Sequence, residues 1–368
     1  MGIYWTIQLT IFGACLFELF CKYRTKIKIL TLLCVMVALF GGLRWNTGND
    51  WDQYYDIFLR STWSNIFHFV RYQIGDNAEL LEPGFVFLNV FIKSILKTFY
   101  WYNIIICGFV QLSYFHFIKY HCPRYPLLLY AVINLAFLYF PVRAGLTVAI
   151  CLWAYRYIKE RKLIPFLLII AVAASLHNQC LIMFPLYWIG YIKPKWYLYY
   201  ITVIMMYIVG NIFQDYVVSF SVLLGGDLGE KLATYTDLES EDFGTTGFMN
   251  VLLKLFVLST CLYIIKHSKQ GNELWNYTLI NIFVICESIS FVFLGSNMVN
   301  LTRLKDPMSV VQSLLFIYTL GYYFKSKSRV ISIFAVLFFV IYYIKQVSAL
   351  GQGYYFKLTC LPYRTIFE

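Results

Sequence analysis

Apolar runs recur along the whole chain and are separated by short polar segments. A helix needs about 20 mostly apolar residues to cross a bilayer, so these runs predict about twelve spans. The expected spans are 3–21, 28–43, 102–118, 125–141, 143–158, 163–175, 179–193, 196–212, 248–265, 274–294, 307–323 and 330–346. Several are short, which favours tilted helices or a locally thinner bilayer. Because no strand-like alternation occurs, we expect an all-α polytopic membrane protein and not a β-barrel.

The apolar stretch 84–99 is a run that we do not count as a span. It contains Lys93 and Lys97, and counting it would reverse the orientation of every later loop. We therefore expect an interfacial or re-entrant helix at this place. It would belong to an outer loop over 44–100 that carries interfacial helices.

Basic residues indicate how the chain is oriented. They are concentrated in short segments between pairs of apolar runs, namely 21–28, 119–124, 155–162, 191–195, 266–270 and 324–329. The positive-inside rule places these segments in the cytoplasm and both chain ends outside. The loop 211–247, expected outside, is strongly acidic. The first basic residue, Lys22, follows the first apolar run, so we expect an uncleaved span there and not a signal peptide.

Composition narrows the function classes. The chain is 60% hydrophobic and only 13% charged, so we expect a single transmembrane domain over 1–368 with no separate soluble domain. The net charge of +11 lies mostly in inter-span loops, and no nucleic-acid partner is expected. The ten cysteines form no CxxC pair and are expected to be buried core residues. Nucleotide-binding and HExxH motifs are missing from the sequence, so we expect no metal and no cofactor.

Three arginines lie on the expected outer face, where basic residues are uncommon. Arg44 ends the second span, Arg143 opens the fifth, and Arg303 precedes the span at 307–323. Any one of them alone would be interpreted as a snorkelling anchor. Together they favour a phosphate site, because a guanidinium donates two parallel hydrogen bonds and stays charged. Arg143 and Arg303 also lie near predicted helix N-termini, which attract anions, so an outer-leaflet diphosphate is the expected ligand.

The stretch GGLRWNTGNDWDQYYDIF (41–58) crowds carboxylates and tyrosines at the end of the second span. Asp50 has two interpretations. It caps a helix that starts at Trp51, or it has a functional role and either orders Arg44 or receives a sugar hydroxyl. The candidate substrate-binding residues on the same stretch are Asp52, Tyr54 and Tyr55.

Other polar residues need an explanation as well. His177 lies in ASLHNQ between two short spans and is either a buried core histidine or a proton-transfer group. Glu82, in LEPGF, either belongs to a Pro-Gly turn that opens a helix or contacts substrate. Asp306, at the head of the span at 307–323, is a further candidate substrate contact. Glu287 lies inside a span, where a carboxylate is functional by default or is paired structurally with Lys254.

Several segments, taken in order, resemble the EpsG family of bacterial membrane proteins, which is related to the Wzy polysaccharide polymerases. The similar segments are GLRWNTGNDWDQYYDIF (42–58), EPGF (82–85), VRAGLTVAICLWAYRYIKERK (142–162) and ASLHNQCLIMFPLY (174–187), followed by Arg303. Two places depart from the family pattern. Ala144 replaces a common Gln or Asn, and Asn178-Gln179 follow the histidine where a small residue is usual.

The resemblance implies a GT-C-like helical bundle in the bacterial inner (plasma) membrane, with a metal-independent glycosyltransferase site facing the periplasm. Such an enzyme polymerises undecaprenyl-diphosphate-linked repeat units into O-antigen, capsular polysaccharide or exopolysaccharide. Arg143 and Arg303, assisted by Arg44, would stabilise the diphosphate. Asp50 or His177 would orient or deprotonate the acceptor hydroxyl. The implied partners are the lipid-linked donor and acceptor glycans, membrane lipid and a chain-length regulator.

Two other functions fit a polytopic membrane protein. An O-antigen ligase would use the same donor but a different acceptor, and the sequence leaves this alternative open. A flippase or transporter for the lipid-linked oligosaccharide would often show two related halves with broken helices at matching positions. The sequence shows no such duplication, and its unusual polar residues collect on one expected face, which favours an enzyme.

Overall fold

The computed structural model describes residues 2–48, 50–66, 71–74, 77–135, 142–206, 208–209, 244–267, 273–295, 303–350 and 354–367. The expected acidic loop 211–247 lies almost entirely outside these residues, as do the ends of the expected spans 125–141 and 196–212. The chain divides into two compact units, one of Met1–Leu181 with Leu320–Glu368 and the other of Ile182–Thr319.

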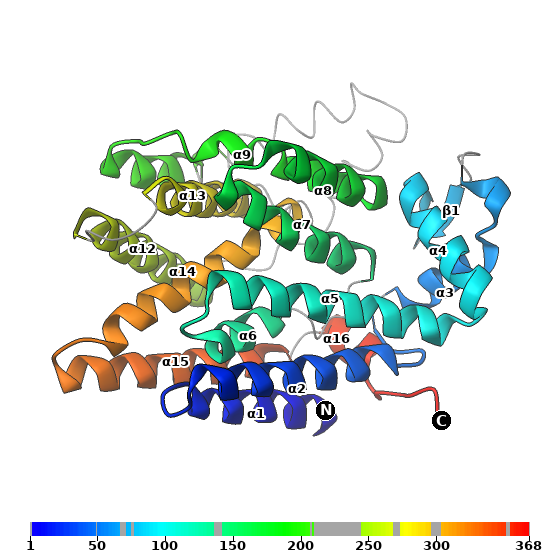
Figure 1. Cartoon of the computed structure of the whole chain (residues 1–368), viewed down its shortest axis with the longest axis horizontal. Helices are drawn as coiled ribbons and strands as arrows, with labels where there is room; N and C mark the ends of the chain where they lie inside the picture. Colours follow the sequence, from blue (N-terminus) through cyan, green and yellow to red (C-terminus); the bar gives the residue numbers. More distant parts are fainter. Residues whose placement is uncertain are drawn as a thin grey trace. The chain divides into compact units, whose positions relative to one another are not determined.

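Helices dominate the described residues (Figure 1), which confirms the helical class predicted from the apolar runs. By length and composition, 4 of the described helices could cross a membrane: Tyr23–Gly42, Phe99–His121, Leu274–Val292 and Arg329–Ser348. Shorter apolar helices are Pro83–Leu96, Leu163–Leu176 and Trp196–Met206. The count of about twelve spans and the GT-C-like arrangement stay predictions.

The core of the first unit is a series of helices in which each packs on the next. In order of contact these are α2 (Tyr23–Gly42), α5 (Phe99–His121), α7 (Arg143–Glu160) and α8 (Leu163–Leu176). The end of α2 approaches α5 very closely, since a Cβ on Gly42 would lie 2.8 Å from the Cα of Ile104. A larger residue at position 42 would separate the two helices.

A buried carboxylate caps another helix of this unit. The short turn η1 (Leu16–Glu18) follows α1 (Gly2–Cys15) and carries Glu18, which is buried. Glu18 accepts hydrogen bonds of 2.6 and 3.0 Å from two backbone N–H groups in the first turn of α6 (Pro126–Asn134). It also pairs with Lys26 at 2.9 Å. Glu18 therefore satisfies helix donors that would otherwise be buried without an acceptor.

The segment between α2 and α5 contains shorter elements. They are α3 (Trp51–Arg60), η2 (Trp63–Asn65), β1 (Arg71–Ile74), β2 (Asn77–Leu80) and α4 (Pro83–Leu96). β1 and β2 pair antiparallel with Arg71 opposite Leu80. This hairpin differs from the all-α prediction, because strands of 4 residues are too short to be recognised from alternation.

Helix α4 occupies the place of the expected interfacial or re-entrant helix at 84–99. It has 14 residues, which corresponds to a length of about 21 Å. That is shorter than the hydrocarbon core of a bilayer, which is about 30 Å thick. The location of α4 at the outer interface stays a prediction.

The C-terminal residues return to the end of α2. After α15 (Arg329–Leu350) and α16 (Tyr354–Cys360), the backbone of residues 359–366 bonds to that of residues 43–48. These bonds are Trp45 N–H to Arg364 O at 2.9 Å, Gly48 N–H to Thr359 O at 2.8 Å and Ile366 N–H to Leu43 O at 3.0 Å. We call residues 354–367 the C-terminal strap.

The second unit does not contain the single span expected at 179–193. The chain instead forms a 3-10 helix, η4 (Asn178–Met183), and a short helix, α9 (Leu186–Ile189). Pro185 lies between them, and its missing N–H and its ring are incompatible with a continuous helix. The long helices that follow are α12 (Gly244–His267), α13 (Glu273–Gly295) and α14 (Asp306–Phe324).

Three polar side chains inside the second unit, Lys254, Glu287 and Gln312, are paired with one another. Lys254 Nζ lies 2.5 Å from Glu287 Oε2, as in the structural interpretation of Glu287, and Gln312 Nε2 donates to Glu287 Oε1 at 2.6 Å. All ten cysteines of the chain are free, and all except the half-buried Cys21 are buried. For the nine buried cysteines this confirms the prediction that they are core residues.

Candidate active site

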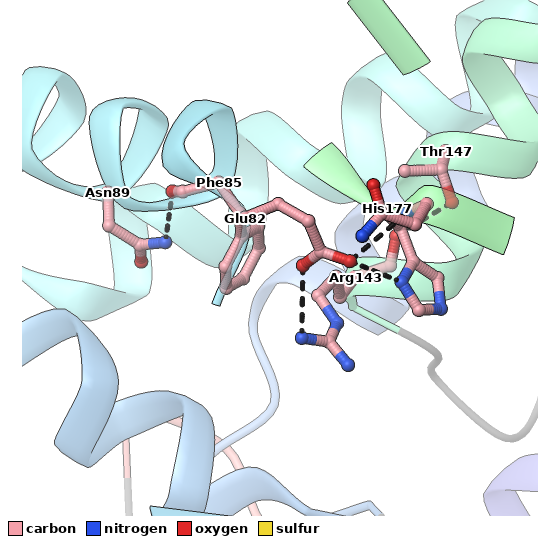
Figure 2. Close-up of polar contacts among 7 residues, drawn as sticks. Glu82, Phe85, Asn89, Arg143, Thr147 and His177 are labelled. Atoms are coloured by element: carbon pink, nitrogen blue, oxygen red, sulfur yellow. Dashed lines mark hydrogen bonds and ion pairs between the residues drawn. The ribbon is translucent and has the colours of Figure 1, made fainter. Parts of the chain in front are cut away.

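Glu82 joins two of the residues predicted from the sequence. It precedes α4, but its carboxylate makes no capping bond to that helix. Glu82 Oε2 lies 3.4 Å from Arg143 Nη1, and Glu82 Oε1 lies 3.0 Å from His177 Nδ1. Oε1 also accepts a hydrogen bond of 3.0 Å from the backbone N–H of Asn178. Figure 2 shows the side chains of Arg143 and His177 meeting at this carboxylate. We call Glu82, Arg143 and His177 the Glu82 cluster.

The partners of Glu82 come from the ends of two helices. Arg143 is the first residue of α7, as predicted. The hydroxyl of Thr147 donates to the carbonyl of Arg143 at 3.2 Å and to that of Ala144 at 2.9 Å. His177 follows the last residue of α8 in an extended conformation, and its N–H still donates to Ala173 O at 2.9 Å. Both side chains are therefore attached to regular structure.

The glycine of the EPGF motif allows α4 to approach the end of α8. A Cβ on Gly84 would lie 2.4 Å from Ser175 Oγ and 2.6 Å from Ser175 O. Pro83 begins the helix, where its missing N–H costs nothing. The Pro-Gly turn that we expected to open a helix therefore has a second effect. It brings Glu82 to the residues that follow Ser175, which include His177.

Burial strengthens the interactions within the cluster. The exposed fractions of the side chains are 11% for Glu82, 13% for Arg143 and 21% for His177. Burial alone would raise the pKa of Glu82. The hydrogen bond with His177, the charge of Arg143 and the N–H of Asn178 act in the opposite direction and lower the pKa overall. Glu82 is therefore ionised at neutral pH.

The ionised carboxylate determines which nitrogen of His177 carries a proton. A carboxylate can only accept hydrogen bonds, so Nδ1 must be the donor in the 3.0 Å contact with Glu82. In the neutral imidazole, Nε2 then has a free electron pair and can accept a proton. A histidine oriented in this way by a carboxylate is a suitable general base.

Arg44 lies in a different environment. It is only 2% exposed, and its backbone forms an isolated β-bridge with Thr365 of the C-terminal strap. Tyr4 and Tyr363 are close enough to interact with it electrostatically. Arg44, which was predicted to assist at the diphosphate, is therefore buried next to the strap, and its contact with the diphosphate stays a prediction.

The candidates on α3 are accessible to different degrees. Asp50 and Asp52 are exposed, whereas Tyr54 and Tyr55 are half-buried. Asp50 immediately precedes α3, but its φ is 59° and its side chain makes no capping hydrogen bond. Capping therefore does not explain Asp50. The ring centroid of Tyr54 lies 6.1 Å from that of Phe85 in α4, which connects α3 to the helix that follows Glu82.

Arg303 and Asp306 belong to the second unit. Arg303 is exposed and Asp306 is the first residue of α14. Burial raises the pKa of Asp306 to about 6, although the positive charges of Lys305 and Arg303 act to lower it. Lys305 Nζ donates to Ser290 Oγ at 2.9 Å. A single diphosphate site that contains both Arg143 and Arg303 stays a prediction.

Two features that support the Glu82 cluster were not predicted from the sequence. The N–H of Asn178 is a backbone donor, which residue type does not reveal, and the role of Gly84 depends on how closely α4 and α8 pack. Among the described residues, no group of three or more His, Cys, Asp or Glu side chains could hold a metal ion.

The comparisons with known proteins give one match. Neither the curated proteins nor the solved structures contain a match. The model of the EpsG family matches residues 27–365, nearly the whole chain, and this range includes every residue of the Glu82 cluster. Members of this family are Wzy-type polymerase-like proteins. The chain therefore belongs to the EpsG family and is a helical membrane protein of polysaccharide biosynthesis.

Proposed function

We propose that the chain polymerises undecaprenyl-diphosphate-linked oligosaccharide repeat units at the periplasmic face of the inner membrane. The donor is one lipid-linked glycan, and the acceptor is the non-reducing end of a second lipid-linked unit. The observation that carries the proposal is the convergence of Arg143 and His177 on the buried carboxylate of Glu82. A guanidinium is a group that can bind phosphate, and an imidazole is a group that can take the proton of a hydroxyl.

His177 is assigned as the general base, in preference to the exposed Asp50. Its Nε2 takes the proton of the acceptor hydroxyl while that oxygen attacks the anomeric carbon of the donor sugar. The bond between this carbon and the diphosphate oxygen breaks, and undecaprenyl diphosphate leaves with the electron pair. Glu82 stabilises the imidazolium that forms, because its Oε1 lies 3.0 Å from Nδ1.

Arg143 stabilises the negative charge that grows on the leaving diphosphate. A guanidinium has five N–H donors, so the 3.4 Å contact with Glu82 through Nη1 is compatible with phosphate binding. Its position at the start of α7 adds the favourable potential of a helix N-terminus. The roles predicted for Arg303 and Arg44 at the diphosphate, and for Asp306 as a substrate contact, stay predictions.

The proposal is tested by replacing the cluster in a bacterium whose polysaccharide depends on this chain. Arg143→Ala, His177→Gln and Glu82→Gln should each reduce long polymer at least about 100-fold and accumulate single repeat units, since each removes transition-state stabilisation. Arg143→Lys should recover only part of the activity, because it retains the charge but loses the fork.

The control is Arg156→Ala. Arg156 lies on the same helix as Arg143, at its other end, and forms a partly exposed ion pair with Glu160. Normal polymer length is expected from this variant. Unchanged polymer in the Glu82→Gln and Arg143→Ala strains, with normal amounts of protein in the membrane, would contradict the proposal.

Purified components distinguish a polymerase from a ligase or a flippase, because the three proteins would form different products. A polymerase makes longer chains from lipid-linked repeat units alone, whereas an O-antigen ligase needs a second type of acceptor and a flippase makes no new bond. Incubating the full chain in nanodiscs with lipid-linked repeats alone therefore separates the three functions, and the products can be resolved by mass.

A further inference from the structure

A group of aromatic rings lies where α3 meets the end of α2. Trp45 and Tyr55 are half-buried, and their ring centroids lie 5.8 Å apart. Trp51, which is 6% exposed, stacks on Tyr55 at 5.1 Å and meets Trp45 edge-on at 4.9 Å. The buried ring of Phe99 contacts both Trp51 and Tyr55. Two partly exposed rings are thus supported by two buried ones.

Polar side chains accompany these rings. Asn46 adjoins Trp45 in sequence, and Asp52 lies one helical turn before Tyr55, on the same side of α3. Asn46, Asp50 and Asp52 are all exposed. Aromatic faces stack on the apolar face of a pyranose ring, while carboxylate and amide oxygens accept hydrogen bonds from its hydroxyls. This combination of side chains is typical of carbohydrate sites and not of a surface that packs against lipid tails.

The loop before α3 is held in an uncommon conformation. Asn46, Gly48 and Asp50 have φ values of 42°, 107° and 59°, all in the left-handed region. Such conformations persist only where the surroundings enforce them, and they are frequent at ligand sites. Here the C-terminal strap supplies the restraint, since Thr359 O accepts the N–H of Gly48 at 2.8 Å. Asn46 and Asp50 are therefore presented from a fixed backbone.

The indole of Trp51 provides an independent indication of a ligand. Its Nε1 is buried and has no hydrogen-bond partner in the part of the chain that the structure describes. A buried N–H donor without an acceptor is unfavourable. Trp51 touches both half-buried rings, and a sugar hydroxyl that reached this N–H would supply the acceptor.

We propose that Trp45, Trp51 and Tyr55, together with Asp50 and Asp52, form a binding site for a neutral or amino sugar of the glycan substrate. This inference rests on the proposed polymerase function and assigns the glycan, not the diphosphate, to this site. We call these five residues the α3 sugar site.

The charge of the α3 sugar site decides between classes of ligand. The carboxylates of Asp50 and Asp52 are exposed beside the rings, whereas Asp56 is paired with Arg60 at 2.8 Å and the neighbouring Arg44 is buried. The two exposed carboxylates disfavour phosphate groups and uronic acids, and they can accept hydrogen bonds from uncharged sugars and from protonated amino sugars.

The helix that carries the site also contacts the helix that follows Glu82. Helix α3 packs on α4, and the rings of Tyr54 and Phe85 meet with a centroid distance of 6.1 Å. Phe85 lies in the first turn of α4, which starts directly after Glu82. A glycan held on α3 can therefore have its neighbouring sugars at the cluster, where the new bond forms.

The test uses the purified full chain in nanodiscs and a panel of short soluble oligosaccharides that are neutral, amino-sugar-containing or uronic-acid-containing. Binding is measured by saturation-transfer NMR with titration. Neutral or amino sugars should bind. Tyr55→Ala should weaken that binding about 10-fold or more through lost stacking, and Asp52→Asn should weaken binding of amino sugars most. Trp51→Phe, which keeps the ring but removes the N–H, should weaken binding about 3- to 10-fold.

Trp63→Ala is the matched control, since Trp63 is 57% exposed and lies outside the α3 sugar site. It should bind the panel like the unmodified chain, and thermal melts should show all variants folded. The proposal is overturned if the panel does not bind, if uronic acids bind as well as neutral sugars, or if Tyr55→Ala and Trp51→Phe bind unchanged. Glu82→Gln should lose polymerisation yet retain sugar binding. If Glu82→Gln instead keeps polymerising, the proposed function fails while the sugar site stands.

Discussion

At the scale of single residues, two partly or fully buried carboxylates have different partners and hence different roles. Glu18 is surrounded by the N–H groups of a helix start and by Lys26, all of which belong to the fold. Glu82 leaves its own helix uncapped and contacts Arg143 and His177, two side chains that are themselves able to bind anions or move protons. Only the contacts of Glu82 indicate a catalytic or binding role.

Gly84→Ala tests whether close packing positions Glu82. The added methyl would overlap the Ser175 carbonyl, so α4 must shift, at a cost of about 1–3 kcal/mol. We expect reduced polymer length together with a lower melting temperature in detergent. Gly108→Ala is the control, because a Cβ on Gly108 meets nothing within 4 Å. Normal polymer from Gly84→Ala would show that the approach of α4 to α8 is not needed for activity.

At the scale of elements, the C-terminal strap connects distant parts of the first unit. It bonds to the backbone after α2, and Tyr4 of α1 donates its hydroxyl to Cys360 O at 2.9 Å. Tyr363 stacks on Phe40 with a centroid distance of 4.6 Å. The strap therefore determines both the burial of Arg44 and the conformation of the loop that leads into α3.

Removal of the strap, by ending the chain at residue 353, should destabilise this end of the first unit. The buried guanidinium of Arg44 and the ring of Phe40 would become exposed to solvent. We expect a lower melting temperature and faster hydrogen exchange at residues 43–60, followed by mass spectrometry. A chain lacking only Phe367 and Glu368 is the control, since Phe367 is 80% exposed. Equal exchange in both truncated chains would contradict the role assigned to the strap.

At the scale of the whole molecule, orientation in the membrane decides whether the Glu82 cluster can meet periplasmic substrates. The cluster adjoins the segment 44–83, which the positive-inside rule places outside. The basic segments 21–28 and 324–329, at other ends of the helices, are expected in the cytoplasm. The sign of the loop charges thus predicts the face on which catalysis occurs.

Cysteine labelling tests this orientation. In a Cys21→Ser background, Ser64→Cys and Ser328→Cys place a thiol at exposed positions, while the other native cysteines are buried. A membrane-impermeant maleimide should label position 64 in intact spheroplasts and should label position 328 only after the membrane is opened. The reverse pattern would place the Glu82 cluster in the cytoplasm and would exclude periplasmic polymerisation.

Patterns among neighbouring residues of the sequence were sufficient to predict the helices and some of the residues at which they begin. Long apolar runs predicted helices, and the helix starts at Trp51 and Arg143 were placed correctly. The pairing of Lys254 with Glu287 was one of the two interpretations of a carboxylate inside a span, and the structure shows this ion pair. Helix formation depends on residues within a few positions of each other, which is why a single sequence reveals it, whereas the structure shows no capping hydrogen bond from Asp50.

Contacts between distant segments were decided only by the tertiary structure. The sequence by itself determined the membrane class, the candidate residues and the resemblance to the EpsG family. It could not show that Glu82 meets a residue 61 positions away and another 95 positions away, or that Thr365 lies opposite Arg44. It also missed the break at Pro185 and the hairpin of β1 and β2. Such contacts depend on how helices pack in three dimensions, and packing depends on the shapes of many side chains at once.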